Sequence, residues 1–295
     1  MAPTAPVGSV IEGQRGLATG LMLTGIASVQ LGSALATTLF DRLGTGGTVL
    51  WRTVFAALVL VALRRPARSM VNRETGRDIV LFGFVLAAMN LCFYLALARL
   101  PLGIAVTFEF TGPLAVALLG SRSRRDAVWA LLAGAGILLF LPDVGDGLDP
   151  VGIAFALAAA TFWGLYILIS ARVGRGPTGL GGLSAAMVVS SALLLPVGIA
   201  DAGSELLVPE LAAAGAAVAM LSSAIPYTVE LQALRRLPAS TFGVLLSLEP
   251  AVAALVGALA LGQGLAGREL VAVSLVVVAG AGALRSGRPI EAPEA

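Results

Sequence analysis

Residues 99–120, RLPLGIAVTFEFTGPLAVALLG, form an apolar run with one carboxylate, Glu109, near its middle. A hydrocarbon core about 30 Å thick is spanned by about 20 helical residues. A charge at the centre of such a helix costs roughly 2.5–3.5 kcal/mol on the insertion scale and normally faces a polar interior. The stretch therefore predicts a membrane-spanning helix whose carboxylate serves a purpose inside the protein.

The composition of the whole chain agrees with this stretch. Of the 295 residues, 58% are hydrophobic and 12% are charged, and the mean hydropathy is +0.94. An average soluble domain has about 25% charged residues. The apolar runs are continuous and do not alternate with polar residues, which disfavours a transmembrane barrel. We therefore expect an all-α integral membrane protein.

Ten apolar runs are separated by charges or by clusters of glycine and proline. They cover residues 17–40, 48–63, 79–98, 101–120, 127–142, 150–171, 179–200, 210–234, 239–262 and 268–285. The sequence therefore predicts ten transmembrane helices between an N-terminal tail, residues 1–16, and a C-terminal tail, residues 286–295.

Arginine is unevenly distributed between the two sides of these spans, and the chain has no lysine. With the N-terminus inside, only Arg42, Arg99 and Arg268 face the exterior, whereas the other arginines of the loops and tails are cytoplasmic. Acidic residues gather in two external loops, at 143–149 and 201–210. Because positively charged loops stay inside, both tails are predicted to be cytoplasmic.

An internal repeat divides the chain into two halves. Residues 96–120 align without a gap with residues 233–257, matching Arg99 with Arg236, Pro101 with Pro238, Pro113 with Pro250 and Gly120 with Gly257. Two five-helix repeats follow, residues 17–142 and 150–285, joined by an external linker at 143–149. Because five is odd, the second repeat is inverted, an arrangement that is typical of secondary transporters.

Two carboxylates lie near the centre of the equivalent helices. At 1.5 Å per residue, Glu109 lies about 12 Å and Glu249 about 16 Å into their helices. Each either binds a substrate ammonium or exchanges a proton, or it has a structural role: a tie to Arg52 for Glu109, or local distortion at Pro250 for Glu249. We expect the two carboxylates to approach one cavity from opposite repeats.

Arg52 is the one cation within the predicted spans. It either holds a substrate carboxylate with its planar guanidinium or extends to the external surface to neutralise Asp41. Glu230 lies nearer the cytoplasmic end of its span and suits a gate or a structural role.

Uncharged polar side chains in the spans predict the lining of a cavity. Residues three or four positions apart share a helix face. The candidates are Gln30 with Ser33, Asn90 with Tyr94, Trp163 with Tyr166, and Tyr227. Interhelical hydrogen bonds are the alternative for any one of them, and anchoring at the membrane interface is the alternative for Trp163 and Tyr166.

Helix-breaking residues lie close to both central carboxylates. Pro113 follows Gly112 in the first repeat, and Pro250 follows Glu249 in the second. Proline removes a backbone donor, so these positions predict either a kink or an interrupted helix of the kind that lines transporter sites.

The sequence excludes several kinds of chemistry. It has no histidine and one cysteine, Cys92, which excludes a histidine metal site or proton relay and a disulfide framework. No GxxxxGK[ST] phosphate loop occurs. We expect no metal, no cofactor and no nucleic-acid partner, with energy supplied by an ion gradient. The alternative classes are an intramembrane enzyme, which would need a nucleophile and base or a metal, and a structural membrane protein.

Three segments carry a resemblance to a known family. They are MNLCFYLALARLPLGIAVTFEFTGPLAVAL (Met89–Leu118), IPYTVELQALRRLP (Ile225–Pro238) and TFGVLLSLEPAVAAL (Thr241–Leu255). The chain resembles the EamA branch of the drug/metabolite transporter superfamily over roughly residues 17–285. EFTGPLAVAL is typical of an amino-acid exporter group within that branch.

The resemblance implies ten helices in two inverted five-helix repeats. It also implies export of small hydrophilic amino acids such as threonine and homoserine in exchange for protons. A broader exporter of metabolites or drugs is the alternative within the superfamily. Gln263 stands where such proteins often have an acidic residue, so no carboxylate acts there. The oligomeric state stays open.

Overall fold

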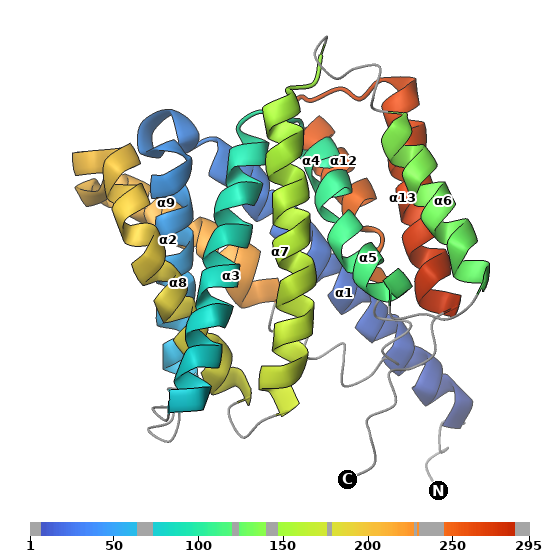
Figure 1. Cartoon of the computed structure of the whole chain (residues 1–295), viewed down its shortest axis with the longest axis horizontal. Coiled ribbons are helices and arrows are strands. Elements are labelled where there is room, and N and C mark those ends of the chain that lie inside the picture. The colour runs from blue at the N-terminus through green and yellow to red at the C-terminus, as the bar shows by residue number, and fades with distance from the viewer. Residues whose placement is uncertain are drawn as a thin grey trace, which may run out of the picture.

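The computed structural model describes residues 7–63, 73–119, 124–139, 147–175, 179–226, 229 and 245–286. These residues are mostly helical (Figure 1). The α-helices are α1 (Val7–Thr37), α2 (Phe40–Leu63), α3 (Arg73–Leu97), α4 (Leu102–Glu109), α5 (Thr111–Leu119), α6 (Arg124–Leu138), α7 (Pro150–Arg175), α8 (Gly179–Ala202), α9 (Pro209–Ala219), α12 (Glu249–Leu261) and α13 (Gly267–Ser286). A 3-10 segment, η3 (Gly203–Leu207), follows α8, and a π-helical segment, η4 (Met220–Ala224), follows α9.

The helices have the length and composition of membrane spans. Five stretches of them are long and apolar enough to cross a bilayer, at Thr19–Thr37, Phe40–Leu63, Gly76–Leu97, Pro150–Ile169 and Gly181–Leu207. Three shorter apolar stretches add to these. Leucines that would be buried in a water-soluble core are exposed here, such as Leu131 at 74% and Leu259 at 79%. This exposure suits a surface that faces lipid, and the chain is an all-helical membrane protein.

The two halves of the chain start at opposite ends of the bundle. In Figure 1, α1 starts and α13 ends at the lower end, whereas α7, which opens the second half, starts at the upper end. The first half therefore begins upward and the second begins downward.

The packing partners of one half recur in the other. Helix α3 packs on α7 and α8, and α9 in turn packs on α1 and α2. Helix α7 contacts α4 and α5, and α1 contacts α12. Three further contacts join helices at equivalent positions in the two halves: α2 with α8, α4 with α12, and α6 with α13.

Glycines at the start of α2 pack closely against the end of α8. Gly44 has a φ of 63°, a left-handed conformation that favours glycine and marks a kink after the first turn of α2. The backbone N–H of Gly46 then donates to the Asp201 carboxylate at 2.8 Å. A side chain from α8 thus satisfies a donor that would otherwise lack a partner near the start of a helix.

Three further polar contacts involve residues at helix ends on this same side of the bundle: two join the halves, and one joins the first half to the residue before α7. These helix ends lie at the upper end in Figure 1. Arg42 pairs with Glu205, and Arg99 pairs with Asp149 at 3.5 Å. The backbone N–H of Leu102, at the start of α4, donates to the side-chain oxygen of Gln263 at 2.9 Å. We call these three contacts and the Gly46–Asp201 hydrogen bond the upper contacts.

The predicted span 101–120 consists of two helices in succession. Helix α4 ends at Glu109, Phe110 forms a turn, and α5 begins at Thr111. The break lies before Pro113 because proline has no N–H for the carbonyl of Glu109, four residues earlier. The second repeat has its turn at Ser247 and Leu248, immediately before α12. Under the sequence alignment, Ser247 is the counterpart of Phe110, so the two breaks are in register.

Gly112 allows α5 to lie directly against α7. A Cβ atom at this position would lie 2.0 Å from the carbonyl oxygen of Ala160. Gly112 therefore serves close helix packing, a role for small residues that is common within membranes.

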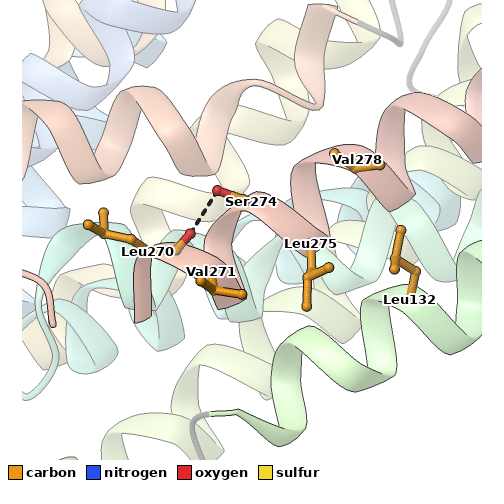
Figure 2. Close-up of a pocket in the computed structure, with 6 residues that line it drawn as sticks. All are labelled: Leu132, Leu270, Val271, Ser274, Leu275 and Val278. Atoms are coloured by element: carbon orange, nitrogen blue, oxygen red, sulfur yellow. Dashed lines mark hydrogen bonds between the residues drawn. The ribbon is translucent and has the colours of Figure 1, made fainter. Parts of the chain in front are cut away.

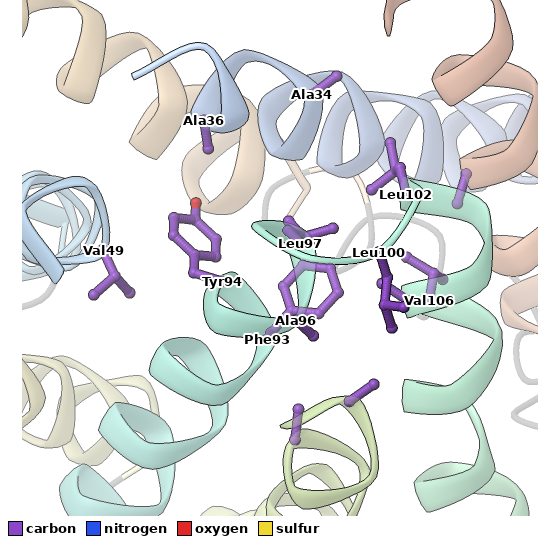
Figure 3. Packing of buried hydrophobic residues seen from close by; sticks show 14 of the residues in the cluster. Ala34, Ala36, Val49, Phe93, Tyr94, Ala96, Leu97, Leu100, Leu102 and Val106 are labelled. Carbon is purple, nitrogen blue, oxygen red and sulfur yellow. The ribbon is translucent and has the colours of Figure 1, made fainter. Parts of the chain in front are cut away.

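The largest buried cluster surrounds Tyr94, which is fully buried (Figure 3). Ala36 of α1 lies beyond its hydroxyl, Val49 of α2 lies to one side of its ring, and Phe93 is its neighbour on α3. The hydroxyl points away from α3 towards Ala36 of α1 (Figure 3). The centre of the apolar cluster thus holds a polar atom.

Candidate functional site

Arg52 points into the protein and not to the surface. Its side chain is partly buried on α2, and its guanidinium carbon lies 5.4 Å from the ring centroid of Tyr94. This is a cation–π distance. Asp41 is exposed at the start of α2 and is not joined to Arg52 by an ion pair in the described structure. Of the two alternatives from the sequence, the structure gives Arg52 the interior position.

A small polar cavity lies beside Arg52. Its volume is about 20 Å³, and residues of α2, α3, α8 and η4 line it: Arg52, Thr53, Ala56, Met89, Asn90, Met187 and Ser223. A cavity of this size has room for about one water molecule. Both halves of the chain contribute to it, because α2 and α3 belong to the first half and α8 and η4 to the second.

Two of the lining side chains are bonded to their own helices. The Thr53 hydroxyl donates to the carbonyl oxygen of Val49 or of Leu50, each 3.0 Å away. The Asn90 amide donates to the carbonyl of Leu86 at 2.7 Å. The guanidinium of Arg52, Oδ1 of Asn90 and the Ser223 hydroxyl are the remaining polar groups of this lining.

Several buried polar atoms of α1, α3 and η4 have no hydrogen-bond partner among the described residues. They include Oε1 of Gln30, Oγ of Ser33, the hydroxyl of Tyr94 and Oγ of Ser222. The hydroxyl of Ser28 donates to the carbonyl of Leu221 at 2.7 Å, which holds α1 against η4. Because buried polar groups are normally bonded, unpaired ones mark a place for water or a ligand.

Glu109 and Glu249 lie at similar depth on antiparallel helices. A Cβ atom on Gly103 of α4 would lie 2.7 Å from the Cα of Ala254 of α12, so the two helices cross there. Glu109 lies about 9 Å beyond this crossing, and Glu249 about 7.5 Å from it in the same direction. Glu249 is buried and Glu109 is partly buried. Their approach to one shared cavity stays a prediction.

Arg52 and Glu109 are the charged candidates of the first half, on α2 and α4. No ion pair within 4.0 Å joins these two described side chains. In this conformation, Glu109 therefore does not form the direct ion pair with Arg52 that the sequence offered as its structural role.

The aromatic candidates of α7 lie in other surroundings. Trp163 meets Phe110 edge to face at 6.2 Å, and Tyr166 stacks on Phe82 at 5.5 Å. Trp163 thus packs against the break between α4 and α5. Tyr227 and Glu230 lie outside the described residues.

The sequence did not single out several residues that the structure brings to the site. Ser223 could have been found, because the pair Ser222–Ser223 interrupts an apolar run. Met89 and Met187 gave no signal, since methionine in a span is ordinary. Gln263 was noted only as a departure from a pattern, and it accepts the hydrogen bond at the start of α4.

A larger hollow on the outside of the bundle has a different character. Its volume is about 360 Å³, and it lies between α6 and α13 with the lining Leu132, Leu270, Val271, Ser274, Leu275 and Val278 (Figure 2). The Ser274 hydroxyl is bonded to the carbonyl of Leu270 at 2.8 Å. An apolar groove of this kind suits lipid chains and offers little to a hydrophilic substrate.

No group of three or more metal-ligating side chains occurs within the described ranges.

Comparison with known proteins also indicates a membrane transporter. The EamA-like transporter family matches residues 150–284. The threonine/homoserine exporter RhtA of Escherichia coli (strain K12) is 40% identical over 269 residues, with 89% of each chain covered. The RhtA protein of Salmonella typhimurium (strain SL1344) is 38% identical over 266 residues, again with 89% of each chain covered.

A solved crystal structure has the same fold. It is 21% identical, with a TM-score of 0.61, and the match covers 92% of this chain and 99% of the other. The relatives are transporters and not enzymes. The chain is thus a multi-pass membrane protein, and it belongs to the EamA-like transporter family.

Proposed function

We propose that this protein exports small amino acids such as threonine and homoserine across the bacterial plasma membrane. The observation that carries the proposal is the 38–40% identity, over 89% of the chain, to proteins named threonine/homoserine exporters. The cavity beside Arg52 supports it, because a zwitterion needs polar partners within the membrane.

The proposed architecture is ten spans in two inverted five-helix repeats, residues 17–142 and 150–285, with residues 143–149 as an external linker. Residues 1–16 and 286–295 are then cytoplasmic tails. Three observations support it: the opposite starting directions of the halves, their recurring packing partners, and the register of the two helix breaks. The upper end in Figure 1 is then the external one.

The proposed mechanism is proton antiport with alternating access. The two repeats rock about the site that they share, and substrate is accepted from the cytoplasm and released outside. Glu109 or Glu249 exchanges a proton during the cycle. The comparable depth of the two carboxylates supports this role, and the turns beside them leave backbone groups free to adjust.

The direct test is transport in proteoliposomes that contain the purified protein. Labelled threonine or homoserine should leave the cytoplasmic side faster when the opposite side is made acidic. Absence of efflux under every imposed pH gradient would contradict the proposed export activity.

A growth screen separates the narrow from the broad substrate range. Cells that overproduce the protein should resist toxic concentrations of a few hydroxy amino acids. Resistance to many unrelated metabolites or drugs would instead support a broad-specificity exporter.

A further inference from the structure

Arg52 is a cation inside the bundle whose described neighbours include no paired carboxylate. Its guanidinium lies over the Tyr94 ring. The ion pairs described for other arginines, Arg42–Glu205 and Arg99–Asp149, lie at the upper end. Charged side chains within spans normally pair with each other or face a polar cavity or pathway. Arg52 is of the second kind, because it lines the 20 Å³ cavity.

The chemistry of the cavity favours an anionic ligand group. Arginine presents five N–H donors in a planar fork that matches the two oxygens of a carboxylate. The Tyr94 ring attracts the cation without supplying a competing anion. Carboxylate side chains are absent from the described lining, so no acidic group of the cavity opposes a bound anion.

We propose that this cavity binds the carboxylate of the transported amino acid, with Arg52 as its ligand and Tyr94 as the residue that positions the guanidinium. The inference rests on the proposed function, and it assigns the carboxylate end of the substrate to the cavity beside Arg52. Oδ1 of Asn90 and the Ser223 hydroxyl lie in the same lining and accept hydrogen bonds from the donors of the substrate.

The present volume fits one carboxylate oxygen and excludes a whole amino acid. Binding therefore requires the walls of the cavity to separate. Two of these walls carry methionines, Met89 on α3 and Met187 on α8. Methionine is unbranched and adapts its shape easily, so these side chains can move without a change of fold. The cavity also lies between the halves, where alternating access separates the helices.

The test compares threonine with threonine amide, which has the same side chain and ammonium group but no carboxylate. Both compounds compete against labelled threonine in proteoliposomes that hold the full-length protein. For the wild type, we expect threonine to compete at least about tenfold better than the amide, the equivalent of about 1.4 kcal/mol. In Arg52→Gln, the two should compete about equally.

Conservative variants separate a ligand from a merely structural residue. Arg52→Lys keeps the charge but loses the fork, so KM for threonine should rise while kcat changes little. Tyr94→Phe keeps the ring and should retain wild-type KM, whereas Tyr94→Leu should raise it. Arg77→Gln, which removes an exposed arginine of α3, is the matched control. Elution volume and melting temperature verify that each variant is folded.

The outcomes distinguish this inference from the proposed function. A wild-type protein that exports neither threonine nor homoserine overturns both. A wild-type protein that exports them, together with an Arg52→Gln protein that still prefers threonine tenfold over the amide, overturns the carboxylate site alone.

Discussion

At the scale of single residues, the described helices carry Glu109, Glu249 and Arg52 within an otherwise apolar bundle. Glu109 and Glu249 lie at similar depth but differ in position relative to the breaks in their helices. Glu109 is the last residue of α4, and Glu249 is the first residue of α12. The two carboxylates therefore cannot be treated as interchangeable copies, although their helices are equivalent.

Replacing Glu109 by glutamine should uncouple export from the pH gradient. A gradient of one pH unit corresponds to about 1.4 kcal/mol per proton, which supports about a tenfold concentration ratio for one-to-one exchange. Glutamine cannot exchange a proton, so the ratio reached by the Glu109→Gln protein should fall to about one. The measurement is the steady-state distribution of labelled threonine across proteoliposomes.

Two companion variants make this result specific. Glu210→Gln removes an exposed acid at the start of α9 and should leave the ratio unchanged. Glu249→Gln tests the other carboxylate. A Glu109→Gln protein that still accumulates threonine tenfold would exclude Glu109 as the coupling residue.

Sequence reasoning reached these residues to different degrees. A charge within an apolar run is easy to recognise in the sequence. The free-energy cost of placing such a charge in the membrane is therefore enough to select Arg52, Glu109 and Glu249 as candidates. The neighbours of a charge depend on how helices distant in sequence pack, and this is why Ser223 and Met187 were missed. The orientation of Arg52 was likewise open, since a residue near a helix end can point outward or inward.

At the scale of helices, close contact between small residues holds the bundle together. Gly103 meets α12, and Gly112 meets α7. The sequence predicted frequent breaks at glycine and proline but did not predict which glycines serve packing. Glycine looks the same in a turn and at a helix crossing, and only the facing helix distinguishes the two.

Gly112→Ala should destabilise the protein strongly. The added methyl group would lie 2.0 Å from the carbonyl oxygen of Ala160, so the backbones of α5 and α7 must separate. Overpacking of this kind typically costs about 1–3 kcal/mol. The measurement is the midpoint of thermal unfolding in detergent, which should fall.

Gly134→Ala is the matched control for this substitution. Gly134 lies within α6, and a Cβ atom there would have no other atom within 4 Å. Alanine has the higher helix propensity, so this variant should be as stable as the wild type or slightly more stable. Equal behaviour of the two variants would show that α5 and α7 are not in close contact.

At the scale of the whole molecule, some helix ends lie at the residues predicted from hydropathy and charge, whereas others do not. Helices α7 and α8 begin at the predicted residues, Pro150 and Gly179. The predicted span 17–40 was too long at its C-terminal end, since α1 ends at Thr37 and α2 already starts at Phe40. A two-residue turn between apolar helices carries no clear signal in the sequence.

The upper contacts should restrain the opening of the external side. The test uses a protein with the substitutions Arg42→Cys and Glu205→Cys, together with Cys92→Ser, which removes the one native cysteine. A short bifunctional thiol reagent that reduction cleaves would cross-link the two introduced thiols. If α2 and η3 separate during transport, the cross-linked protein should lose efflux and regain it on reduction. The readout is the rate of labelled threonine efflux.

The two singly substituted proteins, treated with the same reagent, are the controls and should keep their rates. Full efflux by the cross-linked protein would show that this part of the external side does not open.

The position of Arg52 has an electrical consequence. A fixed positive charge within the membrane lies in the field of the membrane potential, which amounts to about 2.3 kcal/mol per charge for a full crossing at 100 mV. Any movement of α2 through part of that field therefore makes the empty transporter sensitive to voltage. A bound zwitterionic amino acid adds a carboxylate and an ammonium group and therefore no net charge, so the loaded form would remain as sensitive to the potential across the membrane as the empty form.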